Sequence, residues 1–149
     1  MNLSTLPGAL EKRDVLYGVK NASNDELVNL GKQFEAATHY SDALDFFGRA
    51  QAMSEIQRVE NIALNEGDFF LYSRCLKIQG RADDSGAWEA LGDKALSLQK
   101  FRFALRAFER GGLRDKESAL RAQLADQADI QSEEASRVFI PATPADSPV

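Results

Sequence analysis

The most constraining feature of this 149-residue sequence is a residue pattern that occurs twice, 61 positions apart, first from Leu27 and again from Trp88. Both copies carry leucine, glycine, alanine and phenylalanine at the same spacings. The matching members are Leu30 and Leu91, Gly31 and Gly92, Ala43 and Ala104, and Phe47 and Phe108. A unit that repeats in this way buries its apolar face against a neighbouring unit, so the recurrence predicts an array of stacked units.

The periodicity within each copy predicts helices. Leu27, Leu30 and Phe34 stand three and four positions apart, which places them on one helical face. We expect a first helix over residues 7–16, and we expect the helices to be capped by Thr5, Asn24 and Ser54. No alternating β-branched run bounded by turn residues occurs in the sequence. An all-α fold with at least six helices in antiparallel pairs is therefore predicted.

The spacing resembles that of tetratricopeptide repeats, in which each unit is a helix–turn–helix. Residues 24–51 and 85–112 carry the resemblance, and residues 53–80 form a weaker middle copy. There, Glu60 and Tyr72 replace the glycine and alanine of the other copies, which predicts a wider or rotated middle pair. The resemblance implies an α-solenoid of about three antiparallel helix pairs, with N- and C-terminal capping helices, over residues 1–130. An irregular helical bundle is the alternative.

The last 19 residues differ in composition from the rest. Residues 131–149 are first rich in serine and glutamate and then contain three prolines, so we expect a flexible, proline-rich tail there. Its apolar triplet at residues 138–140 is expected to dock on a groove or on a neighbouring subunit.

Composition and charge exclude several classes of function. The net charge of −5 argues against wholesale nucleic-acid binding, where a basic footprint is expected. No apolar run is long enough for a membrane span, and no secretory signal is recognisable. The single cysteine, Cys75, cannot form an intramolecular disulfide. We therefore expect a cytoplasmic protein with no membrane association.

Catalytic chemistry is poorly represented. One histidine and one cysteine cannot make a zinc site of the usual kind, so we expect no metal and no cofactor. His39 falls in a predicted turn and is expected to be exposed, whereas Cys75 falls on an apolar stripe and is expected to be a buried, inert thiol. Glu60 is expected to be partly solvated. The chain is accordingly predicted not to be an enzyme.

The resemblance also implies a binding groove, because in tetratricopeptide repeats the first helix of each pair lines the concave face. The groove candidates that follow are Asn29, Lys32, Gln57, Arg58, Asn61, Asn65, Glu89 and Asp93. The asparagines form a polar ladder that can donate to and accept from the backbone of an extended peptide. Ordinary solvated helix positions are the alternative reading of the same residues.

A second candidate surface lies on the convex side. Arg102, Arg106 and Arg110 stand at four-residue steps on one helical face, and such a row suits phosphate or a carboxylate-rich partner. Phe70 and Ile78 are expected to form an apolar patch there, covered by the N-terminal helix, by residues 138–140 or by a second subunit. An ordinary solvated face is again the alternative.

These features favour a non-enzymatic protein–protein interaction scaffold or adaptor that holds a peptide or helix in its concave groove. The partner is a protein or peptide that the sequence does not identify. The alternative is a self-associating structural subunit of a larger assembly, which would make the chain a homo-oligomer. A nucleic-acid-associated helical protein rests on the arginine row alone.

Overall fold

The computed structural model describes residues 5–18 and 21–138, which form eight α-helices and no strand. This result confirms the all-α expectation. No helix in the described part of the chain has both the length and the apolar character needed to cross a bilayer. The helices are α1 (Ala9–Leu16), α2 (Asn24–Ala36), α3 (Tyr40–Arg49), α4 (Met53–Glu66), α5 (Phe69–Ile78), α6 (Ser85–Ser97), α7 (Phe101–Arg110) and α8 (Arg114–Val138).

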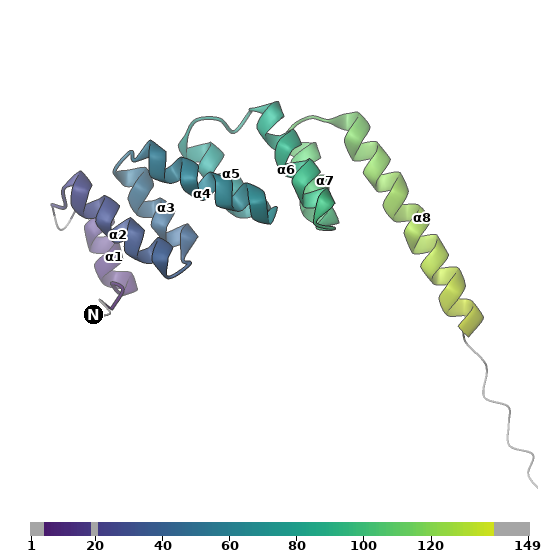
Figure 1. Ribbon diagram of the computed structural model, residues 1–149, viewed down its shortest axis with the longest axis horizontal. Helices are drawn as coiled ribbons and strands as arrows, with labels where there is room; N and C mark the ends of the chain where they lie inside the picture. The colour runs from purple at the N-terminus through teal and green to yellow at the C-terminus, as the bar shows by residue number, and fades with distance from the viewer. Residues whose placement is uncertain (1–4, 19–20, 139–149) are drawn as a thin grey trace, which may run out of the picture.

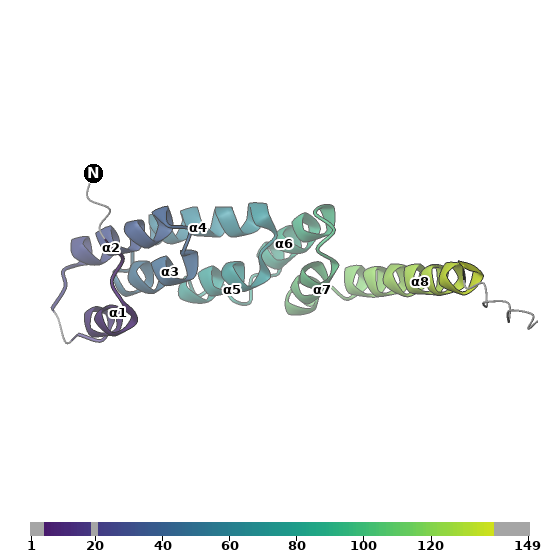
Figure 2. The same ribbon diagram turned by 90° about the horizontal axis from the view of Figure 1, so that it is seen from below.

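Helices α2 to α7 pack as sequential neighbours, α2 with α3, α4 with α5 and α6 with α7, and further contacts join one pair to the next. The pairs form two layers, with α2, α4 and α6 in the first layer and α3, α5 and α7 in the second (Figure 2). Seen face-on, the chain bends into an arch, and α8 runs away from its far end (Figure 1). The turns within each pair lie on the inner edge of this arch.

The two outer pairs owe their close approach to a glycine in the first helix. A Cβ added at Gly31 would overlap the ring of Phe47, and one added at Gly92 would overlap the ring of Phe108. Both rings are buried, so the phenylalanine of each second helix fills the space that the glycine leaves open. The repeated glycine and phenylalanine of the sequence are therefore one packing contact that occurs twice.

The middle pair lacks this contact. Ala43 and Ala104 are fully buried at the outer pairs, whereas the equivalent residue of the middle pair is the larger Tyr72. Glu60 stands where the outer pairs carry glycine. In agreement with the predicted widening, α4 and α5 approach each other over fewer positions than the helices of either outer pair.

The backbone repeats more regularly than the side chains do. Among the described residues, six have positive φ values between 54° and 69°, and they fall into two sets with the same offsets of 29 and 32 positions. These are the offsets by which the sequence aligned the middle copy with the outer ones. Within each pair the residues are Thr38, Gly67 and Gln99, and between pairs they are Gln51, Gly80 and Gly112.

The N-terminal helix lies on α3. Lys12 forms ion pairs with Asp42 and, at 2.6 Å, with Asp45, both on α3. Burial alone would lower the pKa of Lys12, but these carboxylates outweigh it and raise the pKa. The helix begins at Ala9 without a side-chain cap, so the start expected near residue 7 and the cap expected from Thr5 are wrong.

Two other expected caps are also corrected. Helix α2 is capped by Ser23 rather than Asn24: the Ser23 hydroxyl accepts a hydrogen bond from the Glu26 amide at 3.2 Å, and the Glu26 carboxylate accepts one from the Ser23 amide at 2.7 Å. Helix α4 begins at Met53 with no side-chain cap, and the Ser54 hydroxyl donates instead to Glu55 at 2.6 Å.

Helix α8 is longer than the sequence suggested. Leu120 is buried against α7, and Leu113 and Leu124 are half-buried beside it, as expected of a capping helix. The expected domain boundary at residue 130 falls inside the helix, which continues to Val138 because residues 131–138 contain alanine, glutamate and arginine and no proline or glycine. Residues 139–149 of the expected tail lie outside the described residues.

Candidate functional site

The arginine row and the exposed aromatic residue meet on the second layer, where α5 and α7 lie next to each other. We call the side chains that meet there the aromatic–arginine surface. Phe70 is 58% exposed, and its ring packs edge-on against Phe103 with the centroids 5.8 Å apart. The guanidinium of Arg106 lies 5.5 Å from the centroid of the Phe70 ring. The surface comprises Phe70, Phe103, Arg106 and Arg110, together with Arg102, which stands one helical turn before Arg106 on α7.

The three arginines of this surface are exposed and form no ion pair with any described residue. Arg106 and Arg110 lie instead over aromatic rings, Arg110 at 5.8 Å from the centroid of Trp88. Such contacts hold the guanidinium in place and leave its hydrogen-bond donors free. The surface therefore presents donors for anionic oxygens around a partly exposed phenyl ring.

Ile78 does not belong to this surface. It is half-buried in the core cluster and packs against α3, where a Cβ added at Gly48 would lie 3.6 Å from it. The expected apolar patch of Phe70 and Ile78 is therefore reduced to Phe70. Helix α1 packs on α3, and Phe70 remains exposed, so the expected cover by the N-terminal helix is not present.

The exposed ring of Phe70 also borders a cleft of about 510 Å³ at the N-terminal ends of α3 and α5. His39 and Asp42 line it from the α3 side, and Asp68 and Arg74 line it from the α5 side. His39 is exposed at the start of α3, as expected. Arg74 is held by Asp45 at 2.5 Å and by the Ser41 carbonyl at 2.9 Å, so this side of the cleft is already paired.

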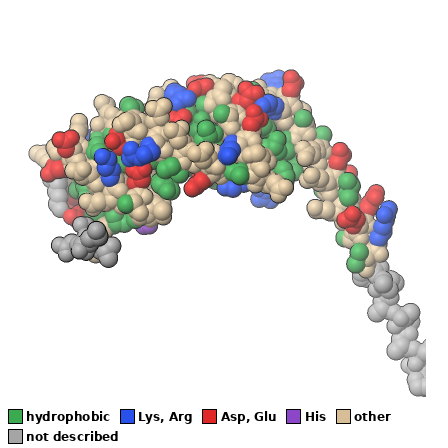
Figure 3. Space-filling model, in the orientation of Figure 1, with side chains coloured by type: hydrophobic (Ala, Val, Ile, Leu, Met, Phe, Trp, Pro, Cys, Tyr) green, Lys and Arg blue, Asp and Glu red, His purple; other side chains and the backbone are tan. Residues whose placement is uncertain are grey.

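The predicted groove residues lie on the first layer. Of the eight, seven are exposed and Glu89 is half-buried. Figure 3 views this layer face-on and shows acidic and basic side chains interspersed over it. The structure thus places the groove candidates on one broad face of the molecule, and it separates them from the arginine row on the other layer (Figure 2).

Each charged groove candidate pairs with a residue outside that set, on another helix of the chain. Arg58 donates to both carboxylate oxygens of Glu35 at 2.8 and 2.7 Å. Lys116 of α8 contacts Glu89 and Asp93 of α6, each at 2.8 Å. The hydrogen bond to Glu35 raises the pKa of Arg58, and those to Asp93 and Glu89 raise the pKa of Lys116.

Sequence reasoning missed these pairings, although a signal for them exists. Lys32 lies 3.9 Å from Glu55, and this pair, like Glu35 with Arg58 and Asp93 with Lys116, is 23 residues apart. Opposite charges at that interval meet because the interval joins facing positions on α2 and α4 and, at the end of the array, on α6 and α8. Arg58, Lys32, Glu89 and Asp93 therefore connect helices within the chain.

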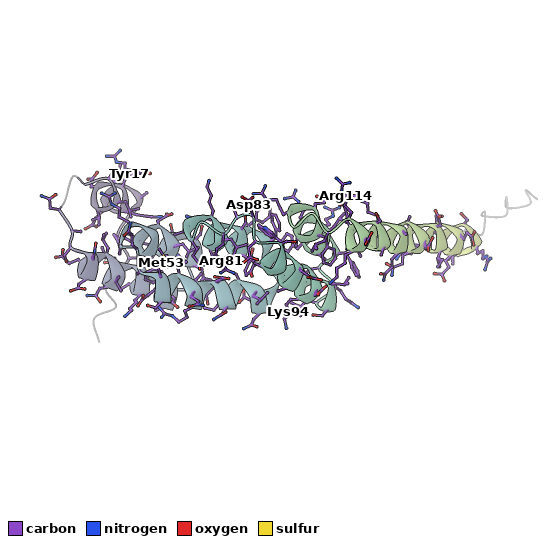
Figure 4. The ribbon with its side chains drawn as sticks, turned by 90° about the horizontal axis from the view of Figure 1, so that it is seen from above. Tyr17, Met53, Arg81, Asp83, Lys94 and Arg114 are labelled. Atoms are coloured by element: carbon purple, nitrogen blue, oxygen red, sulfur yellow. The ribbon has the colours of Figure 1, made fainter. Side chains whose placement is uncertain are left out.

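Glu60 is buried, and the expectation of partial solvation is wrong. It is 7% exposed and accepts hydrogen bonds from Arg81 at 3.0 Å and Gln79 at 2.5 Å. Arg81 also contacts Asp84, which caps α6, at 2.9 Å. Arg81 itself is only partly buried, with 39% of its side chain exposed, and Figure 4 shows Lys94 on the outer side of the first layer. This network ties the middle pair to the third one.

The remaining titratable groups of the interior are held in their neutral forms. Burial and, to a lesser extent, the neighbouring Glu60 carboxylate together raise the pKa of the Cys75 thiol to about 12. Burial likewise raises the pKa of Tyr72 to about 12. Cys75 is fully buried and free, as expected. A thiol in this state is a poor nucleophile at neutral pH.

No protein-family model matches this chain, and neither a curated protein nor a solved structure shows significant similarity to it.

Proposed function

We propose that this chain is a non-enzymatic protein-interaction scaffold, built as a tetratricopeptide-like solenoid, which binds a partner through the aromatic–arginine surface. The observation that carries the proposal is Phe70, exposed to 58% and flanked by arginines without ion-pair partners in the described chain. Exposed aromatic and arginine side chains that lie together are characteristic of the energetically dominant centre of protein interfaces.

The solenoid part of the proposal is supported by the backbone. The left-handed residues repeat with offsets of 29 and 32 positions through all three pairs, including the middle pair, whose side chains diverge. The first half of α8 supports it too, since Leu120 packs on α7 while its outward positions are polar. A polar-faced terminal helix is what a stacked array needs at its end.

The chemistry of the surface favours an acidic partner segment. Arginine binds carboxylates in a two-pronged geometry, and three arginines at four-residue steps can engage carboxylates along a helix or an extended strand. An apolar side chain on that segment would bury the ring of Phe70. The first layer presents fewer unpaired charges to a partner, because Arg58 already pairs with Glu35, and Lys116 of α8 pairs with acidic side chains of α6. We therefore place the binding site on the second layer instead of the predicted concave groove.

A comparative pull-down from lysate of the source cell tests this proposal. The bait is the wild-type chain, a Phe70→Ser/Arg106→Glu variant, or the control Lys94→Glu, whose side chain lies on the first layer. We expect mass spectrometry to find proteins that wild type and control retain and that the surface variant loses by at least about tenfold. Identical protein sets on all three baits would contradict the proposal.

A short DNA duplex serves as the probe for the nucleic-acid alternative. We expect no binding by fluorescence anisotropy at about 150 mM salt, because the net charge of −5 opposes a polyanion. Binding that disappears in the Phe70→Ser/Arg106→Glu variant would instead assign the surface to nucleic acid. A cytoplasmic location is part of the same proposal, and the buried free Cys75 is compatible with it.

A further inference from the structure

The second half of α8 has no packing partner in the described chain. Helix α8 contacts α7 through its first turns, where Leu120 is buried and Leu124 is half-buried, and every residue from 125 to 138 is exposed. Figure 1 shows this half running away from the arch. An isolated helical segment of this length is only marginally stable in water. A partner that packs against residues 125–138 would therefore stabilise their helical conformation considerably.

One face of this segment is acidic around an apolar side chain. Asp126, Asp129 and Glu133 stand at steps of three and four residues, which places them on one helical face, and Ile130 lies among them. Ile130 is 56% exposed. Arg137 contacts Glu133 at 4.0 Å, but both side chains are largely exposed, so this pair is weak.

The aromatic–arginine surface is the complement of this face. Arg102 and Arg110 are two four-residue steps apart, about 12 Å along α7, and Asp126 and Glu133 are about 10 Å apart along α8. Three arginines without ion pairs thus match three carboxylates over nearly the same length. Ile130, in the middle of the acidic face, would meet the exposed ring of Phe70 in the middle of the basic one.

We propose that the second half of α8, residues 125–138, docks on the aromatic–arginine surface of a second copy of this chain. Within one chain the two do not meet, because α8 extends beyond α7 and away from α5 (Figures 1 and 2) and residues 125–138 are all exposed. Two copies that exchange these helices form a closed dimer, and one-directional docking forms a longer assembly. This inference rests on the proposed function, because it names the partner of the same surface.

The test uses two charge-reversed variants of the full chain. The surface variant carries Arg102→Glu, Arg106→Glu and Arg110→Glu, and the helix variant carries Asp126→Lys, Asp129→Lys and Glu133→Lys. Light scattering after size exclusion gives the mass at about 100 μM protein in low salt. We expect wild type to associate and each variant alone to be monomeric, because like charges then face each other.

Mixing the two variants is the decisive step. Each then offers the other an oppositely charged face, so an equimolar mixture is expected to regain the mass of the wild-type assembly. The control Lys94→Glu is expected to associate as wild type does. Circular dichroism checks that each variant folds. If the triple surface variant does not fold, Arg102→Glu alone replaces it, because this substitution removes no contact with an aromatic ring.

Three outcomes would overturn the inference: a monomeric wild type, variants that associate as wild type does, or a mixture that stays monomeric. The proposed function would remain intact if the wild type were monomeric and the Phe70→Ser/Arg106→Glu variant still failed to retain proteins that the wild type retains in the pull-down. The failures of the two proposals are therefore distinguishable.

Discussion

Thr38, Gln51 and Gln99 adopt left-handed backbone conformations, with φ values of 62°, 54° and 59°. A side chain with a Cβ atom raises the energy of this conformation by roughly 1–2 kcal/mol. The equivalent positions of the middle pair are Gly67 and Gly80. The middle pair thus indicates that glycine would be the least strained residue at each of these positions.

Replacing Thr38 with glycine is expected to raise the free energy of unfolding by about 1 kcal/mol, because the left-handed conformation then no longer strains a β-branched residue. Urea denaturation measures the change. Gly80→Ala is the matched control, since a Cβ there meets no atom within 4 Å and the loss of about 1 kcal/mol reflects the backbone alone. A Thr38→Gly variant no more stable than wild type would contradict this interpretation.

The raised pKa of Cys75 makes stability depend on pH at the alkaline end. Because the pKa is about 12 in the folded chain and near 9 in the unfolded one, the unfolded state loses its proton first as the pH rises. Stability is therefore unaffected below about pH 9 and falls above it by about 1.4 kcal/mol per pH unit for this group. Denaturation between pH 8 and 11 should show a shallower fall for Cys75→Ala, which lacks this group and keeps the contributions of the other alkaline groups, Tyr72 and Lys12 among them. Equal slopes would contradict the assignment.

At the scale of the helix, element identity followed from the sequence more reliably than element ends did. The apolar periodicity predicted helices in the repeated copies, but it does not fix their ends. Ser23 and Asn24 are both good capping residues, and the position of Glu26 decides between them through the second hydrogen bond of the capping box. Gly8 and Ala52, which precede α1 and α4, have no side chain that can cap. The residue types at these two positions therefore do not indicate where α1 and α4 begin.

Removing the cap of α2 tests this reading. Ser23→Ala is expected to lower the free energy of unfolding by about 1 kcal/mol, because the Glu26 amide loses its acceptor. Thermal denaturation by circular dichroism measures it. Asn24→Ala, at the position first expected to cap, should change stability by less than half as much. The reverse order of the two variants would restore Asn24 as the cap.

Helix pairing is tested at the fully buried Ala104. Ala104→Leu adds three carbon atoms where α7 meets α6, and overpacking of this kind is expected to lower the free energy of unfolding by roughly 1–3 kcal/mol. Ala90→Leu is the control, because Ala90 is exposed on α6. Denaturant unfolding of both variants gives the comparison. Equal stabilities would mean that α7 does not pack on α6 through this residue.

At the scale of the whole molecule, the arginine row could be predicted from the sequence, whereas the ion pairs of the first layer could not. Arg102, Arg106 and Arg110 share a face through the geometry of a single helix, which periodicity alone determines. The pairing of Arg58 with Glu35 depends on how two helix pairs stack, and no local pattern contains that information. The packing of Ile78 on Gly48 was missed for the same reason.

The division of α8 into a packed and an exposed half predicts how truncation behaves. At a protein concentration low enough to keep the chain monomeric, removal of residues 125–149 is expected to change the free energy of unfolding by less than about 0.5 kcal/mol, since residues 125–138 are all exposed. Removal from residue 113 onward should destabilise strongly, because it uncovers the cluster that Leu120 closes over Ala104 and Phe108. Thermal denaturation compares the two. A large loss from the shorter truncation would mean that the second half of α8 packs on the bundle.

Trp88 is the chain's single tryptophan, and its fully buried indole lies between Phe69 of α5 and the guanidinium of Arg110, donating to the Ala82 carbonyl at 2.8 Å. The intrinsic fluorescence of the protein therefore comes mainly from the seam between the second and third pairs. Emission at short wavelength reports that this seam is closed, and a red shift reports water entering it. Compared with the ellipticity of the whole chain, this optical signal separates opening at one seam from melting of the entire array.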